Sequence, residues 1–325
     1  MNNVYHLGIN LGHDRSAAIV VDGEIKVAIQ QERLDRSKHS LGYLNQFMGD
    51  NTKIQLPWES IHYCLNELGI GFEQLGSITA NMPGTDYSAD ILKKALPQNT
   101  IDKIQVIPSH HLSHAYTAYW PSGFDKSLIL SIDATGSTHR HKTESYSLYQ
   151  ANGNSIELLH SECIDSHLAE LSTLGFLYEY ITKKADFTTR LSDVLEVPEA
   201  GKLMGLASYG KHQKKWTKWF TQKKGSLQVD VASYDIFLEV EALSKLYDQG
   251  EGKAYLRPYI VDLAFKIQEE LEEVMIHIVK TAMQQTGIKK LCIAGGVGLN
   301  SVANYKILQN LGLDDIFIFP AAGDS

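Results

Sequence analysis

Cysteine is scarce in this chain: only Cys64, Cys163 and Cys292 occur among 325 residues, and they are far apart. An odd number of widely spaced cysteines argues against a disulfide framework and fits a reducing compartment. Charged residues break the first apolar stretch from Asp14 onward, so we expect no signal peptide. No run reaches the roughly 18 apolar residues that suggest a membrane-spanning helix. These absences predict a cytoplasmic protein without membrane contact.

An excess of positive charge is also missing. Lysine and arginine number 30 against 38 acidic residues, which gives a formal net charge of −8. Because a nucleic-acid-binding protein needs a basic surface, binding to nucleic acid is not expected. In the one basic stretch, lysines alternate with Trp216, Trp219 and Phe220, so we predict a solvated amphipathic helix there. Its lysines are Lys211, Lys214, Lys215, Lys218, Lys223 and Lys224. At this length and 43% hydrophobic residues, the chain can fill two cores of ordinary size.

Histidines and aspartates at four separate positions could bind one metal ion. His110 and His114 stand four apart in H-H-L-S-H-A, so a helix would place both imidazoles on one face. Asp133 and Asp324 each follow an apolar run typical of a strand, where a carboxylate would emerge at the edge of a sheet. Two imidazoles and two carboxylates suit iron, zinc or manganese better than calcium. The alternative is a cluster of surface histidines without a metal.

The N-terminal residues predict strands joined by polar turns. An apolar run covers residues 4–10, a turn follows at 12–16, and residues 17–21 resume a strand. Asp22-Gly23 is a strong hairpin signal and leads into a strand over 24–30. Hairpin-linked strands with a polar turn between them are typical of the phosphate-binding opening of actin-like and sugar-kinase-like ATPases.

A second, weaker copy of this pattern begins near residue 127. It predicts strands over 128–132, 145–150 and 155–160, with turns at 133–137 and 152–154. Two such units indicate an internal duplication with a nucleotide cleft between the halves. We therefore expect an α/β fold of the actin-like or sugar-kinase-like ATPase class. Its two ribonuclease-H-like subdomains would cover residues 1–125 and 126–325, with a nucleotide and metal site in the cleft.

Helical spacing marks the segments between these strands. Helices are expected over 58–68, 168–184 and 258–285, and short strands over 77–81 and 104–107. Further on, the apolar run 291–294 leads into Gly295-Gly296-Val297-Gly298 and a helix over 299–311. Such a strand, glycine turn and helix let a backbone approach a nucleotide closely. The same pattern also serves as a purely structural turn.

Five segments together resemble the NodU/CmcH family of O-carbamoyltransferases, which includes enzymes of nodulation-factor, cephalosporin and aminoglycoside tailoring. They occur in the family's order from one end of the chain to the other. The segments are L-G-I-N-L-G-H-D-R-S-A-A-I-V-V-D-G-E-I with Q-E-R-L-D-R-S-K-H, H-H-L-S-H-A-Y-T-A-Y-W-P-S-G-F, E-A-G-K-L-M-G-L-A-S-Y-G-K, C-I-A-G-G-V-G-L-N-S-V-A-N and P-A-A-G-D-S.

The resemblance implies a two-step reaction. A carbamoyl-adenylate is made from carbamoyl phosphate and ATP, and its carbamoyl group then passes to a hydroxyl of a small natural-product or sugar acceptor. In this family an N-terminal domain resembling the tRNA threonylcarbamoyl-transfer protein performs the transfer, and a C-terminal domain makes the adenylate. By the same resemblance, the matches to the metal ligands are His110, His114, Asp133 and Asp324, with iron the expected metal.

The resemblance also assigns polar positions. His13 and Lys38 match active-site positions in the opening motif. An imidazole titrates near neutrality, so His13 could accept the proton of the attacking hydroxyl; alternatively it caps the turn or orients a phosphate. Lys38, or Arg33 near it, could neutralise phosphate charge, and a solvated surface loop is the alternative. Positions expected near the adenosine and its phosphates are Lys202, Gly295, Gly296 and Asn300.

The chain departs from the family because it ends at Ser325, inside the unit that carries Asp324. We therefore expect the adenylate-forming domain to be absent and to be supplied by a longer chain or a separate subunit; a homodimer is left open. Two alternatives remain. A tRNA threonylcarbamoyl-transfer protein is disfavoured by Asp133-Ala134-Thr135 in place of a Ser-Gly-Gly type turn. A non-catalytic actin-like nucleotide-binding module would have no need of four metal-ligand matches.

Overall fold

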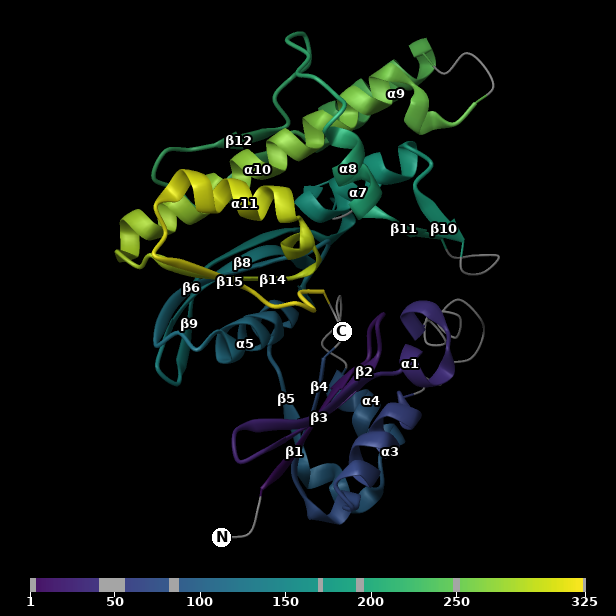
Figure 1. Cartoon of the computed structure of the whole chain (residues 1–325), viewed down its shortest axis with the longest axis vertical. Coiled ribbons are helices and arrows are strands. Elements are labelled where there is room, and N and C mark those ends of the chain that lie inside the picture. Colours follow the sequence, from purple (N-terminus) through teal and green to yellow (C-terminus); the bar gives the residue numbers. More distant parts are fainter. Residues whose placement is uncertain are drawn as a thin grey trace. The chain divides into compact units, whose positions relative to one another are not determined.

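The computed structural model describes residues 4–40, 56–81, 88–168, 172–190, 196–247 and 252–323 (Figure 1). The chain divides into two units by the proximity of its Cα atoms. Unit 1 consists of Met1–His114, Ser137–His139 and Asp324–Ser325. Unit 2 consists of Ala115–Gly136 and Arg140–Gly323.

The sheet of unit 1 grows from the alternating apolar residues near the N-terminus. Its strands are β1 (Tyr5–Asn10), β2 (Ser16–Val21), β3 (Glu24–Gln30), β4 (Leu75–Asn81) and β5 (Ile104–Val106). Their order is β3-β2-β1-β4-β5; the first three are antiparallel, while β4 and β5 add in parallel beyond β1. Asp22 and Gly23 turn the β2–β3 hairpin with positive φ angles of 50° and 85°, as the Asp-Gly signal predicts.

Short helices flank this sheet and bury its apolar side. They are α1 (Glu32–Asp35), α3 (Trp58–Glu67), α4 (Ser88–Ala95) and the 3₁₀ turns η1 (Lys38–Ser40), η2 (Phe72–Gln74) and η3 (Gln98–Lys103). Leu7 and Ile19 of the sheet belong to one buried cluster with Ile61 and Leu65 of α3. The predicted strands over 4–10, 17–21, 24–30, 77–81 and 104–107 and the predicted helix over 58–68 are confirmed within two residues.

The sheet of unit 2 repeats the same plan. Its main strands are β6 (Lys126–Ile132), β8 (Lys142–Asn152), β9 (Ser155–Asp165), β14 (Lys290–Ala294) and β15 (Asp315–Ile318). The two-residue strand β7 (Thr138–His139), which precedes β8 in the chain, falls in unit 1. The order β9-β8-β6-β14-β15 has two antiparallel pairs followed by two parallel pairs, as in unit 1. This shared order and direction of strands agrees with the duplication that the sequence predicts.

Helices of unit 2 pack around a long central helix. They are α7 (Leu174–Lys184), α8 (Ala200–Ala207), α9 (Ser233–Tyr247), α10 (Pro258–Thr286) and α11 (Ser301–Leu311), and the short elements are η4 (Ser166–Leu168), β10 (Thr188–Arg190), β11 (Glu196–Pro198), β12 (Phe220–Gln222), β13 (Val229–Val231), η5 (Ala254–Leu256) and η6 (Gly296–Leu299). Helix α10 begins with proline in its first turn and ends at Gly287, whose φ is 71°. Both ends follow the usual helix signals.

One prediction for this unit was wrong. The basic stretch 211–224 is not a solvated helix: residues 211–219 have irregular structure, and Phe220 opens β12. Trp219 and Phe220 are fully buried in the core of unit 2. Their spacing resembles that of an amphipathic helix, but both side chains pack against other elements. The helix expected over 168–184 is confirmed over 174–184 as α7, which the side chain of Thr173 caps, while residues 169–171 lie outside the described residues.

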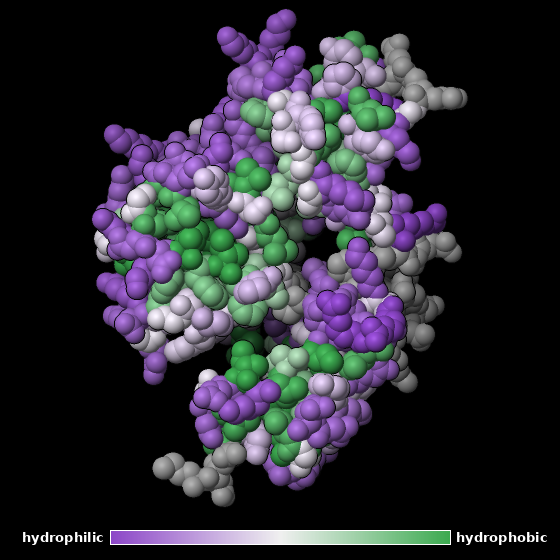
Figure 2. All heavy atoms as spheres, in the orientation of Figure 1, coloured by the Kyte–Doolittle hydropathy of each residue, from purple (hydrophilic) through white to green (hydrophobic). Residues whose placement is uncertain are grey.

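An apolar groove of about 340 Å³ lies between α11 and β15. Figure 2 shows apolar side chains gathered on this face. Leu299, Tyr305 and Leu308 line the groove and are 57%, 59% and 43% exposed. Because isolated apolar side chains are common on surfaces, the grouping rather than the exposure of any one of them distinguishes this face.

Candidate active site

Two histidines converge at the start of α5 (His110–Ser122). The Nε2 atoms of His110 and His114 are 3.1 Å apart, and both side chains are almost completely buried. Their rings meet edge to face at 75°. The later part of α5 belongs to unit 2, where the hydroxyl of Tyr119 donates to the carbonyls of Asp125 and Gly153. The predicted four-residue spacing on a helix is therefore present, and it is a buried pair rather than a surface cluster.

Asp133 follows directly after β6, as predicted from the apolar run before it. One oxygen of its carboxylate accepts from the backbone N–H of Ala134 at 2.7 Å. Thr173, the buried N-cap of α7, donates to the carbonyl of Ala134 at 2.7 Å and accepts from the N–H of Phe176 at 3.0 Å. The turn that carries Asp133 is thus fixed both by its own carboxylate and by the first turn of α7.

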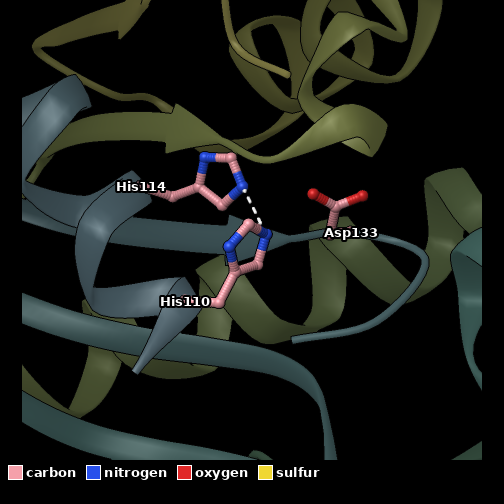
Figure 3. A group of neighbouring side chains, drawn as sticks. All are labelled: His110, His114 and Asp133. Carbon is pink, nitrogen blue, oxygen red and sulfur yellow. Dashed lines mark hydrogen bonds between the residues drawn. The ribbon is translucent and has the colours of Figure 1, made fainter. Parts of the chain in front are cut away.

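His110, His114 and Asp133 have the composition of a metal site. One potential ligand atom from each residue lies within 4.8 Å of the other two (Figure 3). Two nitrogens bound at about 2.0–2.1 Å to one tetrahedral ion lie roughly 3.3 Å apart, close to the separation of these two Nε2 atoms. Two imidazoles and a carboxylate fit a first-row transition metal. Asp324, the fourth predicted ligand, lies outside the described residues.

Asn81 holds the other nitrogen of His110. Its side-chain amide lies 2.9 Å from Nδ1, at the end of β4. An Nδ2 donor at this position corresponds to the tautomer of His110 that carries its proton on Nε2, the atom that faces Nε2 of His114. A metal on Nε2 would require that proton on Nδ1, where the amide oxygen of Asn81 could accept it after rotation. Sequence reasoning missed Asn81, because it lies 29 residues before His110 and only the fold brings the two side chains together.

The turn between β1 and β2 presents His13. The imidazole is 50% exposed, and its Nδ1 lies 2.7 Å from Oδ2 of Asp14. Asn10 organises the turn by accepting from the N–H of Gly12 and donating to the carbonyl of His13. Asp14 takes a positive φ of 58°, which the turn imposes on a residue type that tolerates it. The polar turn predicted at 12–16 is therefore present, with its imidazole oriented by a neighbouring carboxylate.

Lys38 lies in η1 with an exposed side chain. Arg33, the other candidate for phosphate charge, is exposed and lies 3.4 Å from an oxygen of Glu32. Both cations are therefore accessible to solvent.

The glycine turn after β14 lies directly against Asp133. A Cβ added at Gly296 would come within 2.9 Å of Oδ1 of Asp133, and one at Gly295 within 2.2 Å of the carbonyl oxygen of Ile132. A Cβ at Gly175 of α7 would meet Ala134 at 2.5 Å. Glycine at these positions allows three backbone segments to converge on the turn that carries Asp133.

Asn300 and Lys202 occupy different surroundings in unit 2. Asn300 caps α11 by accepting from the N–H of Ala303 and exchanges two hydrogen bonds with Gln268 of α10. Tyr178 of α7 donates to the same glutamine, and burial raises its pKa. Lys202 is 58% exposed on α8 and pairs with Glu199. Asn300 therefore already has a structural role, whereas the ammonium of Lys202 is accessible to solvent.

Known proteins match both the sequence and the fold of this chain. The sequence model described as "Carbamoyltransferase N-terminus" matches residues 72–325. Nodulation protein NolNO of Sinorhizobium fredii is 28% identical over 96% of this chain and 45% of its own length. Uncharacterized protein sll1178 of Synechocystis is also 28% identical, over 96% of this chain and 54% of its own length. The chain thus spans about half the length of these curated relatives.

Solved structures share the fold at low sequence identity. T. kodakarensis HypF matches with a TM-score of 0.56 and 13% identity, covering 99% of this chain and 46% of that one. Component A of the Acidaminococcus fermentans (R)-2-hydroxyglutaryl-CoA dehydratase matches with a TM-score of 0.52 and 17% identity, covering 98% and 93%. The predicted fold is confirmed: the chain has an α/β actin-like ATPase fold with two mixed sheets.

No helix among the described residues is long and apolar enough to cross a membrane.

The sequence match covers most of the chain, including the α5 histidines, Asp133 and the glycine turn. On these grounds the chain belongs to the carbamoyltransferase family, in the region that the family's N-terminal part occupies.

Proposed function

We propose that this chain carries out the transfer step of an O-carbamoyltransferase. A carbamoyl group would pass from carbamoyl-adenylate, itself made from carbamoyl phosphate and ATP, to a hydroxyl of a small natural-product or sugar acceptor. The match of residues 72–325 to the carbamoyltransferase N-terminus is the observation that carries this proposal. The convergence of His110, His114 and Asp133 supports it, because the segments that match the family bring potential metal ligands together.

His110, His114 and Asp133 would hold a divalent metal, with iron our first choice. When bound, such an ion polarises a phosphate or carbonyl oxygen and so stabilises the negative charge that grows during acyl transfer. The protein's own contribution is to keep the ligands fixed. Asn81 orients His110, while Thr173 and the adjacent glycines hold the turn of Asp133.

His13 would act as the general base. The Asp14 carboxylate accepts from Nδ1–H, which leaves Nε2 as the atom that takes the hydroxyl proton of the acceptor. We expect His13→Asn to lower transfer by roughly 10²–10⁴-fold with nucleotide and acceptor affinity nearly unchanged. A parallel loss of nucleotide affinity would instead indicate that His13 contacts a phosphate. An unchanged transfer rate would indicate that His13 serves only as a turn residue.

The remaining predicted positions would help to bind the nucleotide. Gly295 and Gly296 would let the backbone approach the adenosine, and Asn300 would contribute by holding that turn onto α10. Lys38 and Lys202 would pair with phosphate oxygens. The match to the N-terminal part of the family leads us to expect adenine-nucleotide binding without formation of carbamoyl-adenylate. That activity would come from a partner domain.

The direct test supplies the adenylate-forming step separately. The chain is incubated with ATP, carbamoyl phosphate and a separately purified adenylate-forming domain of a relative, together with a panel of hydroxyl acceptors. Mass spectrometry should then detect acceptors heavier by one carbamoyl group, and the His110→Ala/His114→Ala variant should abolish the product. Pyrophosphate release by this chain alone, dependent on carbamoyl phosphate, would show that the steps are assigned to the wrong halves.

Transfer of threonylcarbamoyl to tRNA is the second candidate. A segment of 58 residues, 18% of the chain, is 38% identical to tRNA N6-adenosine threonylcarbamoyltransferase of Nitrosomonas europaea. The same assay with threonylcarbamoyl-adenylate and tRNA separates the two. Product on tRNA and none on small hydroxyl acceptors would favour this candidate. If neither product forms and the chain binds neither metal nor nucleotide, a non-catalytic module is favoured.

A further inference from the structure

Arg15 is a buried cation in unit 1, two residues after His13. Only 6% of its surface is exposed. Its Nε donates to the carbonyl of Ser40 at 2.8 Å, and its Nη2 donates to the hydroxyl of the same serine at 3.1 Å. Ser40 is itself fully buried. The guanidinium of Arg15 therefore connects the beginning of β2 to the end of η1.

The segment that Arg15 contacts, from Asp35 to Ser40, has an unusual backbone conformation. The hydroxyl of Ser40 donates to Oδ2 of Asp35 at 2.6 Å, and Oδ1 of Asp35 accepts from the N–H of Ser37 at 2.8 Å. Arg36 and Ser40 both have positive φ angles, 58° and 46°. Non-glycine residues rarely adopt such angles without strong local constraint. Asp35 and Arg15 both hydrogen-bond to the hydroxyl of Ser40 and together supply that constraint.

Burial of this charge is costly, so its retention calls for a compensating interaction. Burial lowers the pKa of Arg15, while the negative charges of Asp35 and Glu59 act in the opposite direction. A lysine could not reproduce the contact, because only the planar guanidinium donates to two acceptors in a fixed fork. On the other side, the carbonyl of Arg15 accepts from the N–H of Gln31 at 2.7 Å, which ties the same residue to the end of β3.

We propose that Arg15 is a positioning residue: it fixes the Lys38–Ser40 turn relative to the His13 turn, so that Lys38 and His13 are presented together to an anionic substrate. The inference rests on the role proposed above for Lys38. Lys38 is exposed and lies in the turn that ends at Ser40, the residue that Arg15 holds in place. The position of the Lys38 ammonium therefore depends on the contact between Arg15 and Ser40.

A double-mutant cycle tests this relationship with a binding readout. The affinity of the full chain for ATP is measured by calorimetry for wild type, Lys38→Met, Arg15→Met and the double variant. We expect each single variant to weaken ATP about tenfold, the loss of one charge-assisted contact. The double variant should be no weaker than either single one, because Arg15 acts only through Lys38. Metal content should remain at the wild-type level.

Several outcomes would overturn the proposal. If the losses of ATP affinity in the two single variants multiply in the double variant, Arg15 does not position Lys38. The same conclusion follows if Arg15→Met keeps wild-type ATP affinity while Lys38→Met is weakened. Wild-type affinity in Lys38→Met would instead contradict the role proposed for Lys38, and the proposal with it. If Arg15→Met does not fold, Ser40→Ala replaces it in the cycle, since it removes the hydroxyl that links Arg15 to Asp35 but keeps the Ser40 carbonyl.

Discussion

Gly295 lies in direct contact with the carbonyl group of Ile132. A Cβ at position 295 would stand 2.2 Å from that oxygen, and the φ angle of Gly295 is +91°. Ile132 is the last residue of β6 and immediately precedes Asp133. The N–H of Gly295 also donates to the carbonyl of Ala322 at 2.7 Å, so this glycine joins the ends of two strand regions. Both space and backbone conformation therefore require glycine here.

Replacement of Gly295 by alanine should destabilise the protein. We expect Gly295→Ala to lower the free energy of unfolding by about 2–6 kcal/mol, from left-handed strain and overpacking together. Gly205→Ala is the matched control: it lies in α8 with nothing within 4 Å of the added Cβ, and should stabilise by about 0.5–1 kcal/mol. Urea unfolding measures both. Equal unfolding free energies for the two variants would contradict the close approach.

Local patterns were enough to predict much of the fold. The Asp22-Gly23 hairpin, the alternating strands and the glycine turn after β14 depend on neighbouring residues, so periodicity and turn chemistry located them. The α5 histidines were predicted for the same reason, because their spacing alone determines that they share a face.

Features that depend on distant partners escaped sequence reasoning. Trp219 looked like part of an exposed helix, yet its indole N–H donates to Glu239 and its backbone N–H to Glu270, both far along the chain. Thr173 and Asn81 are ordinary polar residues in sequence, and only the fold places them beside Ala134 and His110. Local patterns carry no information about such contacts.

Cysteine reactivity should follow burial. Cys64 is fully buried and burial raises its pKa to about 11; the pKa of the buried Cys292 is raised as well, by burial first of all. Because a raised pKa moves thiolate formation to higher pH, these two thiols should be unreactive near pH 8. A disulfide reagent should therefore titrate one thiol, the exposed Cys163, in the folded protein and three after unfolding. Cys163→Ser should remove the fast phase; a second fast thiol would contradict the described burial.

The pair Lys266–Glu270 should be important for stability. Both side chains are buried on α10, with Nζ and Oε1 2.6 Å apart, and Glu270 also accepts from the N–H of Trp219. Glu270→Ala should destabilise by about 3–5 kcal/mol, since it leaves a buried ammonium without its counter-charge. The double variant Lys266→Met/Glu270→Leu should recover part of that loss in chemical unfolding. The surface variant Lys93→Ala, whose partner Asp90 is exposed, should change little. A double variant less stable than Glu270→Ala would contradict this account.

Metal binding offers the sharpest test of the candidate site. His110→Ala or His114→Ala should abolish binding of iron, zinc or manganese, because each removes one ligand from a small set. Asn81→Ala should weaken binding by about 10–100-fold without removing a ligand, because the amide fixes the orientation and tautomer of His110. Asn81→Asp keeps an acceptor for Nδ1–H and should retain more affinity than Asn81→Ala.

His212→Ala is the control, since that histidine is exposed and pairs with Glu269. Elemental analysis and competition with a chelating dye report occupancy and affinity. Equal metal in wild type and in the double variant His110→Ala/His114→Ala would rule out this site, and full affinity in Asn81→Ala would show that the tautomer of His110 is set by another group.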